Sequence, residues 1–164
     1  MRIAAILVLL SGAAQAQPSL PTRDVDVTYG AAQNVTQRWR FRAADQKLRL
    51  DPPTAGLHMI VDYPAHTMAV VNDTDRTVMM VPAPPAPSGH GTRAGTDSQL
   101  GQPCTVWEQT DSQGQPTQTC YTVDGVMLRA RRGTETLVEA TAITYASADP
   151  SVYAIPAGYT RLAK

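Results

Sequence analysis

The chain has 164 residues, of which 43% are hydrophobic and 17% charged, and its 14 basic and 14 acidic side chains cancel to a formal net charge of zero. This length suits a single domain, and the composition is too apolar for a disordered chain. The balanced charge excludes a basic protein that binds nucleic acid or anionic lipid through its overall field.

The first sixteen residues, MRIAAILVLLSGAAQA, have the order of an export signal. Arg2 supplies one positive charge, residues 3–10 are apolar, and Ala14-Gln15-Ala16 is a small-residue cleavage site. The apolar run is much shorter than the roughly twenty residues that span a bilayer as a helix. We expect a signal peptide cleaved after Ala16 and a soluble periplasmic or secreted product, residues 17–164, with no integral membrane segment.

Beyond the signal, apolar and polar side chains alternate with the period of two that is typical of strands with one buried face. Val25, Val27 and Tyr29 alternate with Asp26 and Thr28. The same pattern continues in further short segments, at residues 35–43, 47–51, 57–63, 67–71 and 76–81. Because turn-forming sequences separate these segments closely, antiparallel pairing of neighbours is expected.

Residues 82–103 interrupt the alternation. The segment begins PAPPAP, continues SGHG and stays polar up to Leu100, so we expect no strand or helix through it. Connections of this length inside a compact domain are usually functional or mobile. We favour a Pro/Gly-rich crossover between two halves of one sheet, with a lid as the alternative.

Four more strands are predicted at residues 104–110, 117–123, 126–132 and 136–145, the third beginning after an Asp124-Gly125 hairpin turn. No segment has sustained helical periodicity. Nine or ten strands with almost no helix to cover them should curl. The predicted fold is therefore mainly β, with a single curved antiparallel sheet, either an open half-barrel or a closed barrel, and little helix.

Two cysteines, Cys104 and Cys120, flank a predicted turn at residues 111–116. Folding the chain back at this turn brings the thiols together, and an oxidising compartment favours their pairing. The C-x-x-C spacing of redox-active thiols is absent. We expect a structural disulfide, with free thiols as the alternative.

Residues that could bind a metal or catalyse a reaction lack the sequence spacing of known metal-binding or catalytic motifs. His58 and His66 could approach across a hairpin, with Asp62 or Asp73 supplying oxygen, but His58, His66 and His90 show no H-x-H or H-x-x-x-H spacing. Residues 72–75 begin like a calcium loop without its glycine and glutamate. Neither G-x-S-x-G nor a glycine-rich phosphate loop occurs. We expect no metal site, no cofactor and no enzyme.

A row of arginines, Arg38, Arg40 and Arg42, lies on one face of a predicted strand. The row could accept an anionic headgroup. Alternatively, it is a solvated face balanced by Asp24 and Asp26, and this is the interpretation that we favour.

Five methionines fall on predicted strands, and flexible thioethers suit adaptable apolar surfaces. These side chains could simply fill the core. In an open half-barrel, however, the best candidates to line the concave side and hold a ligand are Trp39, Phe41, Leu57, Met59, Val61, Met68, Val70 and Met80.

Several segments carry a family resemblance. They are GQPCTVW at 101–107, DGVMLR at 124–129, VYAIPAGY at 152–159, KLRLD at 47–51, MIVDY at 59–63 and MAVV at 68–71. Together they resemble exported bacterial β-sheet proteins of unassigned function and are similar to the periplasmic lipoprotein-carrier superfamily. The resemblance implies an incomplete barrel, often capped by helices, that holds acyl chains. The expected function is a periplasmic binding or carrier module for a lipid, a lipidated protein or another hydrophobic ligand. The alternative is a non-catalytic envelope interaction or structural protein with a packed interior.

Overall fold

A computed structural model describes residues 20–31, 35–87, 91–111 and 113–163. The signal peptide expected at residues 1–16 and the side chain of His90 lie outside these ranges. In the described part of the chain, no helix has the length and apolar character needed to cross a membrane.

The described residues form twelve strands and one short 3-10 helix. They are β1 (Val25–Ala31), β2 (Thr36–Arg42), β3 (Lys47–Asp51), β4 (Leu57–Asp62), β5 (Thr67–Asn72), β6 (Thr77–Pro82), β7 (Thr92–Gln99), β8 (Gln102–Thr110), β9 (Pro116–Tyr121), β10 (Met127–Arg132), β11 (Glu135–Thr144), η2 (Pro150–Tyr153) and β12 (Thr160–Leu162). The predicted mainly-β fold with little helix is confirmed.

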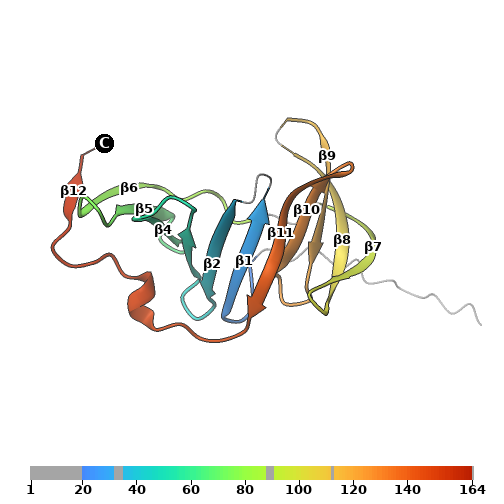
Figure 1. The fold of residues 1–164 in the computed structure, drawn as a ribbon, viewed down its shortest axis with the longest axis horizontal. Coiled ribbons are helices and arrows are strands. Elements are labelled where there is room, and N and C mark those ends of the chain that lie inside the picture. Colours follow the sequence, from blue (N-terminus) through green and yellow to red (C-terminus); the bar gives the residue numbers. More distant parts are fainter. Residues whose placement is uncertain (1–19, 32–34, 88–90, 112, 164) are drawn as a thin grey trace, which may run out of the picture.

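All twelve strands belong to one sheet, in the order β12-β6-β5-β4-β3-β2-β1-β11-β10-β9-β8-β7. The sheet has β12 at one edge and β7 at the other, so it is open and not a closed barrel (Figure 1). Neighbouring strands are antiparallel except β12, which pairs with β6 in parallel. Of the two architectures expected from the sequence, the open one is therefore correct.

The expectation of no strand between residues 82 and 103 was wrong, because Thr92–Gln99 forms the edge strand β7. Every residue of β7 except Gln99 is exposed, so the strand lacks the apolar alternation by which the others were predicted. Backbone pairing with β8 forms β7, and this pairing leaves no trace in side-chain hydrophobicity.

From β1 to β6 the register places apolar side chains of successive strands next to each other on one face, here called the apolar face. One row across the strands is Val27, Trp39, Leu50, Met59, Val70 and Met79. The row beside it is Val25, Phe41, Leu48, Val61, Met68 and Val81. The alternation seen in the sequence thus adds up across six strands to a continuous apolar surface.

The C-terminal segment covers the opposite face of β4–β6. There a second core of Ile60, Ala69, Val71 and Val78 packs with Met80 against Ile155 and Tyr159. In Figure 1 the chain leaves β11, passes through η2 and reaches β12 beside β6. With one face covered in this way, the exposed part of the apolar surface lies on the other.

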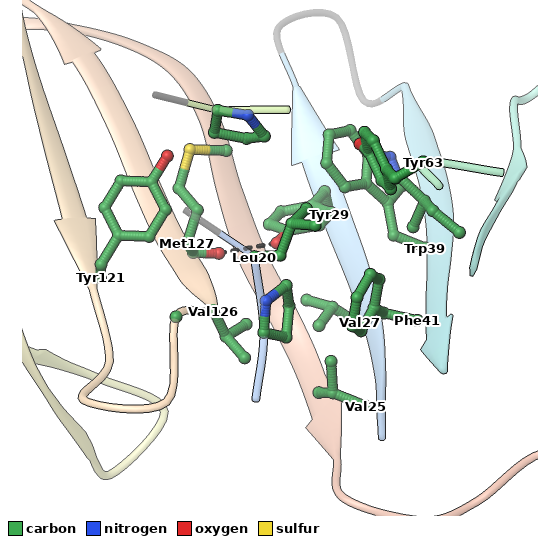
Figure 2. A pocket seen from close by; sticks show the side chains of 14 residues that line it. Leu20, Val25, Val27, Tyr29, Trp39, Phe41, Tyr63, Tyr121, Val126 and Met127 are labelled. Carbon is green, nitrogen blue, oxygen red and sulfur yellow. Dashed lines mark hydrogen bonds between the residues drawn. The ribbon is translucent and has the colours of Figure 1, made fainter. Parts of the chain in front are cut away.

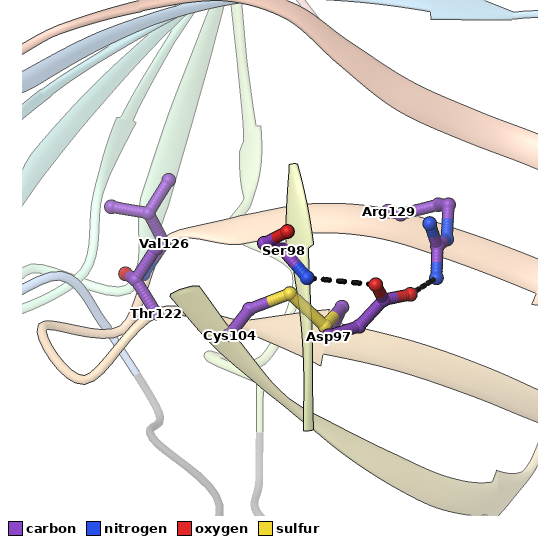
Figure 3. Close-up of a disulfide and its surroundings, with 7 residues drawn as sticks. Asp97, Ser98, Cys104, Thr122, Val126 and Arg129 are labelled. Carbon is purple, nitrogen blue, oxygen red and sulfur yellow. Dashed lines mark hydrogen bonds and ion pairs between the residues drawn. A yellow bond between two sulfur atoms is a disulfide. The ribbon is translucent and has the colours of Figure 1, made fainter. Parts of the chain in front are cut away.

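The predicted disulfide between Cys104 and Cys120 is confirmed, with an S–S distance of 2.00 Å and 5.4 Å between the Cα atoms. The bond joins β8 to β9 (Figure 3). Across this strand pair Cys120 lies opposite Val106 in register. Both cysteines are buried and belong to the main core. The disulfide thus fixes two strands of the half of the sheet that ends at β7.

Candidate functional site

A cavity of about 260 Å³ lies on the apolar face, between β1–β3 on one side and the β9–β10 hairpin on the other. Figure 2 shows side chains converging on it from both sides. Its walls are Leu20, Pro21, Val25, Val27, Tyr29, Trp39, Phe41, Leu48, Tyr63, Pro87, Tyr121, Gly125, Val126 and Met127. Apolar and aromatic groups dominate this lining.

The wall contributed by β1 and β2 follows directly from their alternation. Val25 and Val27 face Phe41 and Trp39 across the strand pair. Tyr29 packs edge-on against Trp39, with 5.1 Å between ring centroids and an interplanar angle of 67°. Such edge-to-face packing is a favoured geometry of aromatic pairs and fixes both rings.

Tyr29 connects the two walls of the cavity. Its hydroxyl donates a 2.7 Å hydrogen bond to the main-chain carbonyl of Met127, on the far wall (Figure 2). Only 2% of Tyr29 is exposed, and burial raises the pKa of its phenol well above the usual value. The hydroxyl therefore stays protonated and keeps its role as donor.

The N-terminal wall, Leu20 and Pro21, is held in place by Asp124 in the β9–β10 turn. The main-chain N–H of Thr22 donates to the carbonyl of Asp124 at 2.9 Å, and Arg23 forms an ion pair with the Asp124 carboxylate. The Arg23 guanidinium also lies over the ring of Tyr145, 3.5 Å from its centroid. The segment before β1 is thereby fastened to the opposite side of the cavity.

Asp124 is suited to this role because it is ionised. Burial alone would raise the pKa of its carboxyl, but hydrogen bonds from Thr122 and Arg23 outweigh burial and lower the pKa. The Thr122 hydroxyl also accepts a 3.0 Å hydrogen bond from the N–H of Val126. One short turn thus supplies both the anchor and part of the lining.

The lining offers mainly apolar contacts and few polar groups. Among its fourteen residues there is no carboxylate, imidazole, amine or thiol. The indole Nε1 of Trp39 is buried and has no hydrogen-bond partner among the described residues. In the described ranges, no group of three or more histidine, cysteine or acidic side chains could hold a metal ion.

Two of the eight residues expected to hold a ligand, Trp39 and Phe41, line the cavity. Five others lie on the same face but further toward β6, and all of them except Leu57 belong to the two rows. They are Leu57, Met59, Val61, Met68 and Val70. Met80 lies on the opposite face, packed against the second core.

Sequence reasoning missed most of the lining. The alternation on β1 predicted that Val25, Val27 and Tyr29 share one face. They were not among the expected lining residues, because those were chosen from β2 and β4–β6 alone. Tyr121 and Val126 could not be found in this way, because β9 and β10 reach the cavity only through the long-range pairing of β1 with β11.

The histidines considered as metal ligands lie apart. His58 is near the start of β4 and 2% exposed, whereas His66 is exposed in the turn that follows the other end of the strand. The Nδ1 of His58 lies 2.9 Å from a carboxylate oxygen of Asp73, whose other oxygen accepts a 2.8 Å hydrogen bond from Tyr159. This contact joins the sheet to the C-terminal segment.

The arginine row is matched by carboxylates. Arg38 pairs with Asp26, which lies on β1. Arg40 lies 2.6 Å from Asp51, and Arg42 lies 2.9 Å from Asp45. Asp24 instead accepts a 2.8 Å hydrogen bond from the N–H of Ala43. The row is balanced by carboxylates as expected, but Asp51 and Asp45 take the place expected for Asp24, and the side chains of Arg40 and Arg42 are only 16% and 23% exposed. These pairings leave the row little capacity for an outside anion.

Comparison with known proteins identifies the fold alone. No protein-family model matches the chain, and no curated protein matches it. An uncharacterized conserved protein from Thermus thermophilus has a similar structure, with a TM-score of 0.65 at 7% identity, covering 86% of this chain and 90% of that one. PNGF-II matches with a TM-score of 0.52 at 11% identity, covering 87% of this chain and 32% of that one.

Proposed function

We propose that this protein binds a hydrophobic ligand, such as a lipid tail or the lipid of a lipidated protein, in the cavity between β1–β3 and the β9–β10 hairpin. The observation that carries the proposal is an apolar cavity of about 260 Å³ lined in part by residues of the main hydrophobic core. Binding cavities are typically apolar with a few placed polar groups. An engineered apolar cavity of about 150 Å³ is already large enough to take up benzene.

The two apolar rows support a ligand longer than the cavity. Beyond Trp39, the first row continues through Leu50, Met59 and Val70 to Met79, which is 37% exposed. The strands are about 4.8 Å apart, so the row gives an extended apolar ligand a surface on which to continue. The resemblance to the lipoprotein-carrier superfamily agrees with a ligand of this kind.

We also propose that the protein acts outside the cytoplasm, in the periplasm or as a secreted protein. The disulfide between Cys104 and Cys120 suits an oxidising compartment. The charge, apolar run and small residues at positions 1–16 follow the order of an export signal.

The test is to purify the protein from its native envelope and identify any bound lipid by mass spectrometry. Binding is then measured in vitro with a polarity-sensitive fluorescent probe that carries an acyl chain, with unlabelled fatty acid as competitor. We expect lipid to co-purify and the probe to be displaced. A protein that carries no lipid and binds no probe would instead favour an envelope protein with a packed interior.

A matched pair of variants localises the binding. Met127 lines the cavity and is half-buried, so Met127→Trp should fill the cavity and weaken probe binding at least about tenfold. Leu162 is exposed on β12, outside the cavity and outside both apolar rows, and Leu162→Trp should leave probe binding intact. Equal effects of the two substitutions would place the ligand elsewhere.

A further inference from the structure

A second hollow, of about 170 Å³, lies on β7–β10 and shares no lining residue with the apolar cavity. Its lining is mostly polar and includes two cations from β10. The residues are Thr96, Asp97, Val106, Gln118, Thr119, Cys120, Arg129 and Arg131. Because Cys120 forms the disulfide with Cys104, this part of the sheet is covalently fixed (Figure 3).

One of the two arginines has its counter-charge within the hollow. Arg129 forms an ion pair with Asp97, and its side chain is 13% exposed. The hydrogen bond from Arg129 is the main cause of the lowered pKa of Asp97, and the charge of Arg131 adds to it. Asp97 is therefore ionised and committed to Arg129, with its second oxygen accepting a hydrogen bond from the N–H of Ser98 at 2.7 Å (Figure 3).

Arg131 has no such partner. Within the described residues its side chain makes no hydrogen bond and no ion pair, and its Nε is fully buried. Its neighbour Gln118, opposite in register, donates its amide to Glu108 at 2.9 Å, and Glu139 lies opposite Arg129. Neither glutamate is paired with Arg131. The buried Nε–H of Arg131 is costly, because it has lost water without gaining a hydrogen-bond partner.

We propose that this hollow binds a small oxyanion, a phosphate or a carboxylate, through the guanidinium of Arg131. A guanidinium presents five N–H donors in a planar fork that matches the oxygens of such anions. Asp97 neutralises Arg129, so the hollow takes one negative charge rather than two. The hydroxyl of Thr96 and the side-chain N–H groups of Gln118 also line the hollow and can donate to the anion. The site is independent of the ligand proposed for the apolar cavity.

The test is a titration of the full chain with inorganic phosphate, sulfate or acetate, followed by backbone amide chemical shifts and by calorimetry. Ionic strength is held constant, because exposed charges are screened by salt. We expect saturable binding of at least one anion, with shifts centred on β9 and β10. The order of the three affinities tells whether the site prefers a tetrahedral oxyanion or a planar carboxylate.

Substitutions separate a built site from general charge attraction. Arg131→Gln should weaken binding at least about tenfold, since it removes the charged donors. Arg93 is an exposed arginine outside the hollow, and Arg93→Gln should bind as the wild type does. Gln118 is exposed, so Gln118→Glu should fold normally and weaken anion binding by repulsion, which keeps the test valid if Arg131→Gln is unstable.

No saturable binding of any of the three anions would overturn the proposal. So would binding that Arg131→Gln and Gln118→Glu leave unchanged, or binding that Arg93→Gln weakens equally.

Discussion

The hydroxyl of Tyr29 on β1 donates its hydrogen bond to the main-chain carbonyl of Met127 at the start of β10, 98 residues further along the chain. The bond crosses the apolar cavity and joins its two walls, although β11 lies between the two strands in the sheet. A single buried donor thus helps to hold the cavity at its width.

Removing this hydroxyl should destabilise the fold. Tyr29→Phe leaves the buried carbonyl of Met127 without this partner, and the expected loss is about 1–3 kcal/mol of unfolding free energy. Denaturant unfolding measures it. Tyr63 also lines the cavity, but its hydroxyl has no hydrogen-bond partner among the described residues, so Tyr63→Phe is the control and should change stability little. Equal losses in the two variants would show that the Tyr29 hydrogen bond contributes nothing specific.

The carboxylate of Asp124 should stabilise the protein in a pH-dependent way. Its pKa is lower in the folded chain than the ordinary value of 3.8, so the folded state favours the charged form. The stabilisation is fully present above pH 3.8 and is lost as the pH falls through the lower folded pKa. Asp124→Asn should therefore cost about 1–3 kcal/mol near neutral pH, and the cost should shrink in acid.

Unfolding free energies of wild type and Asp124→Asn, measured from neutral pH down to the acid limit of folding, check this dependence. Arg23→Gln removes the guanidinium while leaving the Asp124 carboxylate, so it takes away the ion pair and the contact with the Tyr145 ring together. The Arg23 side chain is 57% exposed, so its removal should cost much less than Asp124→Asn. A difference between wild type and Asp124→Asn that stays constant with pH would contradict an ionised anchor.

The disulfide should stabilise mainly by restricting the unfolded chain. Cys104 and Cys120 are 16 residues apart, and closing a loop of this length is worth about 3 kcal/mol in the chain-entropy account. The double variant Cys104→Ala/Cys120→Ala should lose about that amount in denaturant unfolding. Reductant should destabilise the wild type to a similar extent and leave the double variant unaffected. If reductant does not change the unfolding free energy of the wild type, the disulfide does not form.

How far the sequence predicts this molecule depends on whether side chains or backbone decide each feature. Alternation on β1 to β6 is enough to place Trp39 and Phe41 on a shared face with Leu48, because each strand pairs with its neighbour in the chain. The exposed strand β7 and the parallel strand β12 depend on backbone pairing and have no buried face to reveal them.

The sequence predicts only one wall of the cavity, because the other wall depends on long-range strand pairing. Its near wall comes from consecutive strands, whose partners follow from short turns. Its far wall comes from the Thr122–Val126 turn, which meets β1 only because β11 pairs with both β1 and β10. Met80 was expected in the lining, but period two places it and its neighbour Met79 on opposite faces, and the apolar face receives Met79.

Buried His58 should make stability fall in mildly acidic solution. Burial is the main cause of its lowered pKa, the charge of Arg49 adds to it, and contact with Asp73 opposes it. The unfolded chain therefore binds a proton more readily than the folded one, so stability is present above pH 6.5 and is lost as the pH falls through the lower folded pKa. His58→Gln should flatten this dependence, whereas His66→Gln, at an exposed turn, should keep it. Unfolding free energies measured across this pH range test the prediction. The carboxylate of Asp73 also accepts a hydrogen bond from the hydroxyl of Tyr159. Protection of the C-terminal segment from hydrogen exchange should therefore fall with the same pH profile. A segment whose protection stays constant as stability falls would show that His58 acts on the sheet alone.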